Sequence, residues 1–481
     1  MTETIIGLLH RNAADPGRVF LVLEDGVTVT YAEQLARSRA VAAGLRDRGV
    51  RTGDRVLVQL PNCREFFDVW FASALAGAVL VPTNPQSASA ELVHIVADAT
   101  PAVSVRSVGD VDELRATADG GAAPEPPPAI AAILYTSGTT SRAKGVMITD
   151  ASYVTVGHAV TEHLSVTAED RWLVVLPLFH ANAQFYCVMS ALVCGASVAL
   201  IPRFSASRWG RQARDMGATL ASLFAAPIRM ILASDPPPGE SPNRLRAVLF
   251  AQNISTADAA TFEGRFGTRL LQLYGMTETV VPPTINPDDR TRRWDSIGRP
   301  LPGIGVELVN PDGMTVGGPG VGEMRIAAEA GLTVAAGYWN DARATAETFT
   351  EAGLRTGDLA RRDADGFLFF VDRAKDMIKR GGENVSAGEV ERVASDHPAV
   401  AECAAVGVPD PVRDEAILLV VTVRPGHTVT SAELRRWCAE HLSAFKVPSS
   451  VVFVDALPRT SVGKIRKAEL RSLHHPDALT P

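Results

Sequence analysis

Short apolar runs alternate with longer stretches of helical character along the chain up to about residue 370. The run DRVLVQL at 54–60 precedes CREFFDVWFASALAG at 63–77, and AVLVPT follows at 78–83. Further apolar runs that are typical of buried strands lie at 172–178, 197–203, 246–251 and 268–275. Because strands that alternate with helices form largely parallel sheets covered on both faces, the pattern predicts an α/β fold with stacked sheet layers.

One segment, Ala183 to Ile201, is apolar over almost the length of a membrane span. Gly195 divides it into a first half of helical character and a second half rich in β-branched residues. A buried helix followed by a buried strand therefore explains the segment better than a transmembrane helix does.

Glycine and proline mark the changes of organisation along the chain. The stretch ADGGAAPEPPPA at 118–129 predicts a loop inside the first domain. In 297–327 the same residue types separate short strands, which predicts a small antiparallel β unit, with a barrel as one form of it. Helical stretches at 388–397 and 431–443, together with several strands, predict a small α+β domain at the end of the chain. The predicted domains are 1–373 and 374–481.

Composition narrows the class of protein. The chain has 481 residues, too many for one ordinary core, and it is 46% hydrophobic and 21% charged, as is typical of a soluble globular enzyme. Its formal net charge of -7 argues against binding to nucleic acid. The five cysteines form no C-x-x-C pair, and the first residues lack the features of a signal peptide. We therefore expect buried thiols and a cytoplasmic location.

The stretch YTSGTTSRAKGV at 135–146 crowds hydroxyl side chains, a glycine and a lysine between two apolar runs. Gly138 lets the backbone turn tightly, so that amides and hydroxyls can face one concavity, and Lys144 adds a positive charge. The stretch therefore predicts a phosphate-binding loop, and a Ser/Thr-rich surface turn is the alternative. A Walker A loop is excluded, because Ala143 precedes the lysine and Gly145 follows it.

Together with three later motifs, this stretch resembles the adenylate-forming superfamily, which includes acyl-CoA synthetases, nonribosomal-peptide adenylation domains and luciferases. The later motifs are LYGMTET at 273–279, RTGDLARRDADGFLFFVDRAKDMIKRGGENVS at 355–386 and PRTSVGKIRK at 458–467. They follow one another in order along almost the whole chain. Two further stretches, HANAQFY at 180–186 and FKVPS at 445–449, resemble the carnitine/crotonobetaine–CoA ligase branch of acid–thiol ligases.

The resemblance implies an ATP-dependent acid–CoA ligase. In such enzymes a carboxylate attacks the α-phosphate of ATP to give acyl-AMP and pyrophosphate, and the thiol of CoA then displaces AMP. The resemblance also implies a large N-terminal AMP-binding domain and a small, mobile C-terminal domain that carries the catalytic lysine. ATP, Mg²⁺ and CoA are the implied cofactors and co-substrates, and a small carboxylic acid is the implied substrate.

Roles for individual residues follow from the same resemblance. Lys464 is expected to neutralise charge that develops at the α-phosphate, and Thr277, Glu278 and His180 complete the expected catalytic set. Glu278 is also the expected magnesium ligand, and Lys375 is the expected hinge between the domains. The residues expected to bind ATP or CoA are Thr136, Ser137, Gly138, Thr139, Thr140, Lys144, Tyr274, Asp358, Arg373, Lys379, Gly381 and Gly382.

The acyl pocket is expected to be lined by Asn182, Ala183, Phe185, Phe250, Ala251, Gln252, Asn253, Gly275 and Thr279. The amides of Gln252 and Asn253 would narrow this pocket or bind a polar group. We therefore expect a short or polar acid rather than a long fatty chain as the substrate.

Two other functions stay open at this point. An adenylating enzyme could pass its acid to a carrier-protein pantetheine or to a small nitrogen nucleophile instead of CoA. A degenerate protein could hold a nucleotide without chemistry, although the intact set of phosphate-binding residues argues against that reading. We expect no nucleic-acid partner and no membrane span, and a homodimer is the oligomeric form considered.

Overall fold

The computed structural model describes residues 3–87, 89–116, 129–136, 143–236, 243–373, 376–380, 383–410, 414–459 and 465–473. Contacts divide the chain into two compact units, which are described separately. Unit 1 covers the described residues of Met1–Thr136, Arg142–Val306 and Ile326–Leu354. Unit 2 covers those of Glu307–Arg325 and Arg355–Pro481. The predicted domain boundary between residues 373 and 374 stays a prediction.

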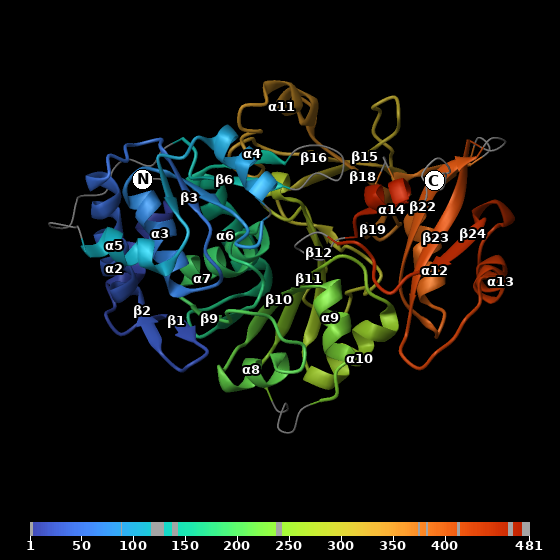
Figure 1. Cartoon of the computed structure of the whole chain (residues 1–481), viewed down its shortest axis with the longest axis horizontal. Helices are drawn as coiled ribbons and strands as arrows, with labels where there is room; N and C mark the ends of the chain where they lie inside the picture. Colours follow the sequence, from blue (N-terminus) through green and yellow to red (C-terminus); the bar gives the residue numbers. More distant parts are fainter. Residues whose placement is uncertain are drawn as a thin grey trace. The chain divides into compact units, whose positions relative to one another are not determined.

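The first sheet of unit 1 carries the ends of the predicted phosphate-binding segment (Figure 1). Its strands, in spatial order, are β5 (Val103–Val105), β3 (Arg55–Val58), β4 (Val79–Pro82), β6 (Ala132–Thr136) and β7 (Lys144–Ile148). The first four are parallel, whereas β6 and β7 form an antiparallel hairpin. The strands predicted at 54–60 and 78–83 are therefore confirmed. The helices of this part of the chain are α2 (Tyr31–Asp47), α3 (Arg64–Leu75), α4 (Ser89–Ala99) and α5 (Val108–Ala116).

A nine-stranded sheet forms the centre of unit 1. Its strands, in spatial order, are β14 (Arg299–Pro300), β13 (Thr284–Ile285), β12 (Arg269–Tyr274), β11 (Ala247–Ala251), β10 (Leu220–Phe224), β8 (Arg171–Val174), β9 (Ser197–Leu200), β1 (Val19–Leu23) and β2 (Thr28–Thr30). All neighbours from β12 to β1 are parallel. Leu249 and Phe250 are consecutive in β11 but pack into two different hydrophobic cores. The sheet is therefore buried on both faces, as the apolar runs predicted.

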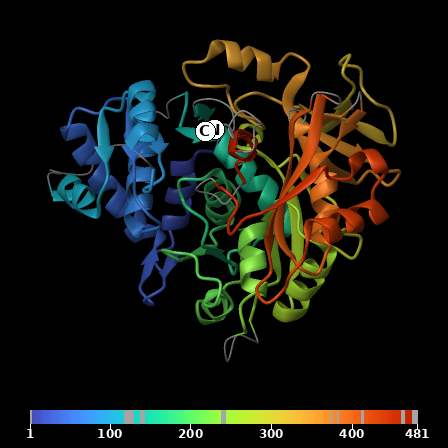
Figure 2. The same ribbon diagram turned by 45° about the vertical axis from the view of Figure 1, so that its right-hand side comes forward.

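Helices cover both faces of this sheet. They are α1 (Ile5–Ala13), α6 (Asp150–Leu164), α7 (Met189–Cys194), α8 (Trp209–Asp215), α9 (Ala225–Leu232) and α10 (Thr256–Phe266). Helices α9 and α10 lie beside strands β10 to β12 in both views (Figures 1 and 2). The α9 and α10 side packs around Trp209 and Phe262, and the opposite side packs around Phe185 and Tyr153.

The apolar segment from Ala183 to Ile201 forms a buried helix and a buried strand, as predicted. It begins as a π-helix, η1 (Ala183–Val188), continues as α7 and ends in β9. Gly195 ends the helix with a φ of 75°, a left-handed conformation that glycine adopts without a steric cost. Within the described part of the chain, no helix is long and apolar enough to cross a membrane.

Two five-stranded sheets follow in the later part of the chain. The first contains β15 (Gly305–Val309), β16 (Gly320–Ala327), β18 (Gly353–Arg362), β17 (Phe349–Thr350) and β19 (Leu368–Arg373), and β18 pairs with β17 and β19 in antiparallel fashion. The second contains β21 (Glu383–Val385), β20 (Ile378–Arg380), β23 (Asp414–Val423), β22 (Val400–Asp410) and β24 (Ser450–Phe453). The helices here are α11 (Ala342–Thr348), α12 (Ala387–Ser395), α13 (Ser431–His441) and α14 (Lys467–Leu473). The predicted antiparallel unit and the predicted α+β region are both confirmed.

Candidate active site

The predicted phosphate-binding segment lies between two paired strands. Thr136 is the last residue of β6 and Lys144 is the first of β7, and the antiparallel ladder pairs them directly. The Thr136 hydroxyl donates to the Lys144 carbonyl oxygen at 3.5 Å. The structure thus fixes the lysine at the end of a hairpin, where its side chain is half-buried. The other predicted residues of this segment, Ser137, Gly138, Thr139 and Thr140, lie outside the described residues.

A second group of predicted residues follows the end of β12. Tyr274 is the last residue of that strand, and a short 3₁₀ helix, η2 (Thr277–Thr279), follows it. The Thr279 hydroxyl accepts a hydrogen bond from the Met276 backbone N–H at 3.0 Å, which stabilises this tight turn. Glu278, at its centre, is buried with 6% of its surface exposed. Residues at the carboxyl end of a parallel strand are well placed for ligand binding, because such edges form the binding crevices of open α/β sheets.

Tyr338, which no motif in the sequence singles out, brings these two groups together. Its hydroxyl donates to Glu278 Oε1 at 2.9 Å, and the Lys144 Nζ lies 4.9 Å from the centre of its ring. Burial raises the pKa of Tyr338, and the neighbouring Glu278 carboxylate raises it further, so that the hydroxyl remains a hydrogen-bond donor. The only signal in the sequence is a pair of adjacent aromatic residues, Tyr338 and Trp339, inside the stretch AAGYWN, which is not specific.

The predicted acyl-pocket residues near His180 lie at the start of the π-helix. His180 is half-buried and packs against the Phe179 ring at a centroid distance of 4.3 Å. Asn182 is 7% exposed, and its Oδ1 accepts no hydrogen bond from the described residues. Ala183 and Phe185 are completely buried. Short π-helical turns occur frequently at functional sites, because they shift side chains out of the α-helical register.

Tyr186, which was not among the predicted pocket residues, reaches the turn after β12. A Cβ atom on Gly275 would lie 3.0 Å from the Tyr186 hydroxyl oxygen and 3.4 Å from Thr279 Oγ1. Only 5% of Tyr186 is exposed. The Tyr186 hydroxyl therefore brings the π-helix next to the Gly275 turn. Any side chain at position 275 would crowd the hydroxyls of Tyr186 and Thr279.

The predicted residues from Phe250 to Asn253 are divided between two environments. Phe250 is completely buried in the core around Trp209, whereas Ala183 and Phe185 belong to the core on the other face of the sheet. Ala251 and Gln252 are half-buried, and Gln252 has a φ of 74°. Asn253 Oδ1 accepts a hydrogen bond from Gln272 Nε2 at 2.9 Å. The Asn253 amide oxygen, which was expected to face the substrate, therefore already accepts a hydrogen bond from the protein itself.

In unit 2, Asp358 and Arg373 are partners across the β18–β19 ladder. Arg373 Nε lies 3.2 Å from Asp358 Oδ1, and the Asp358 side chain is 5% exposed. Lys379 has an exposed side chain, and its backbone N–H donates to Glu415 Oε2 at 2.7 Å. Four other predicted residues lie outside the described residues, namely Lys375, Gly381, Gly382 and Lys464.

The residues that flank position 464 are held by several contacts. Arg459 and Ile465 form an isolated antiparallel bridge, and the Arg466 backbone N–H donates to the Pro458 carbonyl at 2.8 Å. Lys467 Nζ lies 2.8 Å from Glu391 Oε1, so that α14 is joined to α12 by an ion pair. The chain on both sides of the predicted catalytic lysine is therefore anchored within unit 2.

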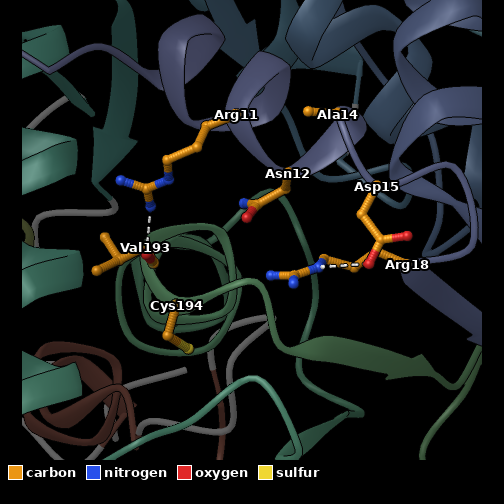
Figure 3. Close-up of a pocket in the computed structure, with 7 residues that line it drawn as sticks. All are labelled: Arg11, Asn12, Ala14, Asp15, Arg18, Val193 and Cys194. Atoms are coloured by element: carbon orange, nitrogen blue, oxygen red, sulfur yellow. Dashed lines mark hydrogen bonds and ion pairs between the residues drawn. The ribbon is translucent and has the colours of Figure 1, made fainter.

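A cavity of about 600 Å³ in unit 1 contains none of the predicted site residues (Figure 3). Its lining residues are Arg11, Asn12, Ala14, Asp15, Arg18, Val193 and Cys194. Both guanidinium groups already have partners, because Arg11 contacts Glu3 and the Val193 carbonyl, and Arg18 Nε lies 3.7 Å from Asp15 Oδ2. Burial raises the pKa of the Cys194 thiol, which makes it a poor nucleophile at neutral pH.

A resident cluster of metal ligands is absent from the described part of the chain, where no three His, Cys, Asp or Glu side chains come close enough to hold an ion. Glu278 is a single carboxylate that receives a hydrogen bond at one oxygen. Such an arrangement fits Mg²⁺, which proteins commonly hold through one or two carboxylates together with substrate phosphates.

Comparison with known proteins identifies two matching families. The family described as AMP-binding enzyme matches residues 8–339, and the family described as AMP-binding enzyme C-terminal domain matches residues 389–464. The crotonobetaine/carnitine–CoA ligase of Escherichia coli O157:H7 is 34% identical over 460 residues, which cover 88% of this chain and 89% of that protein.

Solved structures show the same fold over nearly the whole chain. ATP-bound MatB from Rhodopseudomonas palustris superposes with a TM-score of 0.91 at 27% identity, covering 99% of this chain and 100% of the other. The o-succinylbenzoate CoA synthetase from Bacillus subtilis, solved with the acyl-adenylate OSB-AMP, has a TM-score of 0.87 at 28% identity, with coverage of 96% and 97%.

Proposed function

The chain belongs to the family of AMP-binding enzymes, and from this we infer that it is an ATP-dependent acid–CoA ligase. It joins a carboxylic acid to AMP with release of pyrophosphate and then transfers the acyl group to the thiol of CoA. The observation that carries this proposal is the cluster of Lys144, Tyr338 and Glu278. One tyrosine contacts both an ammonium group, through its ring, and a carboxylate, through its hydroxyl. A triphosphate with its magnesium ion requires both kinds of group.

The nucleotide has candidate partners among the described residues. We propose that Lys144 and Thr136 bind the β- and γ-phosphates, that Thr277 contacts the α-phosphate and that Tyr274 stacks on adenine. Asp358 would accept hydrogen bonds from the ribose hydroxyls, with Arg373 beside it, since an ionised carboxylate has acceptors for two donors at once. Glu278 would bind Mg²⁺, which supplies positive charge to offset that of the phosphates.

Adenylation requires charge neutralisation more than covalent chemistry. An oxygen of the substrate carboxylate attacks the α-phosphorus, and the bond between that phosphorus and the pyrophosphate oxygen breaks. Negative charge grows on the α-phosphate oxygens in the transition state, and we propose that the ammonium group of Lys464 stabilises it there. Fixed charges in a site that excludes water are worth more than in bulk solvent, because no solvent has to reorganise.

Thioester formation uses the second set of predicted residues. The CoA sulfur attacks the acyl carbonyl carbon, and the bond from that carbon to the AMP oxygen breaks. We propose that the pantetheine arm passes close to the backbone at Gly381 and Gly382, since glycine has no side chain of its own, with Lys379 beside it and Lys375 as the hinge. The cytoplasm is the proposed compartment, where the five free thiols would stay reduced.

The acid is proposed to be short or polar. The support comes from Asn182, whose buried Oδ1 has no partner among the described residues, and from the Tyr186 hydroxyl beside Gly275. A buried polar group without a partner costs free energy unless the substrate supplies a hydrogen bond. Such a site discriminates strongly in favour of acids that carry a matching polar group.

A panel of short acids, polar acids and fatty acids tests the function, with AMP, pyrophosphate and acyl-CoA measured in the presence and absence of CoA. We expect pyrophosphate without CoA, and AMP with acyl-CoA when CoA is added. Formation of ADP instead of AMP would contradict the proposal. If carrier-bound pantetheine proved a better acceptor than CoA, the proposed acceptor of the second half-reaction would be wrong, but the adenylation step would stand.

The role of Lys464 has its own test. Lys464→Ala should reduce exchange of pyrophosphate into ATP by about two to four orders of magnitude, comparable to removing one strong electrostatic stabiliser. The same variant should still transfer a preformed acyl-adenylate to CoA. Exchange at the wild-type rate would show that another group stabilises the transition state.

A further inference from the structure

The ring of Tyr338 contacts two groups that lie far apart in the sequence. Lys144 begins β7, and Glu278 lies in the turn after β12. The ring face meets the Lys144 ammonium at 4.9 Å from its centre, and the hydroxyl donates to Glu278 Oε1 at 2.9 Å. One side chain therefore sets the separation between a candidate phosphate ligand and a candidate magnesium ligand.

The position of Tyr338 is itself fixed by its neighbours. Its backbone forms an antiparallel bridge with Val146 of β7, and its N–H donates to Thr345 Oγ1 at 2.9 Å. The Phe349 ring packs edge-on against the tyrosine ring at a centroid distance of 5.7 Å. Only 7% of Tyr338 is exposed. A side chain held from several directions can orient another group, because its own rotamer is locked.

Backbone contacts tie the same segment to both groups. The Ala335 N–H donates to the Glu278 carbonyl at 2.9 Å, and the Trp339 N–H donates to the Gly145 carbonyl at 2.7 Å. The stretch 335–339 therefore spans from the Glu278 turn to the beginning of β7. Backbone movement at the Glu278 turn or at the beginning of β7 would break these hydrogen bonds, whereas the two side chains are held by the ring and hydroxyl of Tyr338.

We propose that Tyr338 is a positioning residue that holds the Glu278 carboxylate for Mg²⁺ and the Lys144 ammonium for the phosphates, an inference that rests on the proposed function. In this proposal Tyr338 acts through these two groups and not on the reacting atoms themselves. It orients one carboxylate oxygen by hydrogen bonding, which leaves the other oxygen for the metal ion. Groups that orient a metal ligand in this way typically contribute about 10- to 100-fold to metal affinity.

Two substitutions separate the roles of the hydroxyl and the ring. Tyr338→Phe removes the hydrogen bond to Glu278 and keeps the aromatic face under Lys144. Tyr338→Leu removes both. Tyr31→Phe is the matched control, because Tyr31 is another buried tyrosine of unit 1. Its hydroxyl lies within hydrogen-bond distance of the carbonyls of Ala191, at 3.1 Å, and Ala196, at 2.6 Å, and neither of these is a candidate site residue.

Calorimetric titration with ATP, in EDTA and in excess Mg²⁺ and without any acid substrate, measures the effect on binding alone. In Tyr338→Phe the gain in ATP affinity on adding Mg²⁺ should fall by about tenfold, while affinity in EDTA stays near that of wild type. Tyr338→Leu should in addition lose about two- to fivefold affinity in EDTA, because the cation–π contact is gone. Tyr31→Phe should match the wild type in both conditions.

A double substitution distinguishes positioning from a general loss of structure. If Tyr338 acts through Glu278, adding Tyr338→Phe to Glu278→Gln should cause no further loss of the Mg²⁺ effect. Additive losses would overturn the inference, and so would an unchanged Mg²⁺ effect in Tyr338→Phe. A wild-type protein that binds no ATP would overturn the proposed function itself, and the inference with it.

Discussion

Replacing Lys467 with methionine should destabilise the α12–α14 region by about 2–3 kcal/mol, and more at pH 8 than at pH 5. The Lys467 ammonium lies 2.8 Å from Glu391 Oε1, and the two side chains are only 17% and 23% exposed. Methionine keeps most of the length and apolar surface of the lysine but leaves the carboxylate without its partner. The loss therefore reports the ion pair rather than the packing.

The magnitude follows from distance and burial. At 2.8 Å and an effective dielectric constant near 20, the attraction between two unit charges is ~6 kcal/mol, from which the cost of removing both from water must be subtracted. Removing one member of a buried pair typically costs about 3–5 kcal/mol. Because both side chains keep some exposure, water recovers part of this cost, and about 2–3 kcal/mol remains.

The pH dependence follows from the direction of the pKa shifts. Burial raises the pKa of Glu391 even with Lys467 present, so ionisation of this carboxyl opposes folding as the pH rises through its folded pKa. Burial lowers the pKa of Lys467, but the carboxylates of Glu391 and Asp372 reverse the effect and keep the lysine charged. Without the lysine, the Glu391 pKa rises further. The protonated carboxyl of Glu391 needs no charged partner, whereas the carboxylate does, so the loss caused by removing the lysine should grow as the pH rises.

Hydrogen exchange of α12 peptides, corrected for intrinsic rates at each pH, measures this local stability. Lys467→Arg should retain most of the stability, and Glu391→Gln combined with Lys467→Met should be less destabilised than Lys467→Met alone. Arg343→Met, which breaks an exposed pair with Glu347, is the control and should leave exchange unchanged. Equal losses at pH 5 and pH 8 would refute the electrostatic explanation.

Two further substitutions test other parts of unit 1. Burial raises the pKa of Asp150 to about 6, although the hydrogen bond from the Ile5 N–H lowers it, so ionisation of this carboxyl opposes folding above that pH. Asp150→Asn keeps a hydrogen-bond acceptor for the Ile5 N–H and should stabilise the protein by about 1–3 kcal/mol at pH 8 but little at pH 4. Thermal unfolding at the two pH values measures the difference. Gly275→Ala would place a Cβ 3.0 Å from the Tyr186 hydroxyl, so KM should rise about tenfold or more for the largest acid used and less for the smallest. Gly264→Ala is the control, because a Cβ at that position meets nothing within 4 Å. Equal changes in KM for all acids in Gly275→Ala would contradict a place for Gly275 in the acyl pocket.

The sequence predicted the architecture of unit 1 well because its signals are local. The runs 54–60 and 78–83 are too short for a helix and too apolar for an exposed strand, and the stretch 63–77 between these two runs has the length of a helix. Gly195 showed where the long apolar segment changes from helix to strand, since a left-handed backbone ends a helix. The ordered motifs likewise gave a prediction of which residues bind a nucleotide, and that prediction is still to be tested.

Some contacts could not be predicted, because they depend on how distant segments meet. Leu249 and Phe250 are adjacent in the sequence, yet successive residues of a strand point to opposite faces, so only the placement of the sheet between two cores shows which one faces Ala183 and Phe185. No periodicity in the sequence predicts that the Tyr186 hydroxyl lies beside Gly275, or that Gln272 Nε2 donates a hydrogen bond to Asn253 Oδ1.

The amino-acid sequence thus determined the α/β class of this protein, its order of strands and helices and the kinds of side chain available to a triphosphate. The tertiary structure decided which of those side chains share a neighbour. Tyr338 is an ordinary aromatic residue until the chain folds its segment between β7 and the turn after β12, because side chains far apart in the sequence interact only when backbone pairing brings them within a few ångströms.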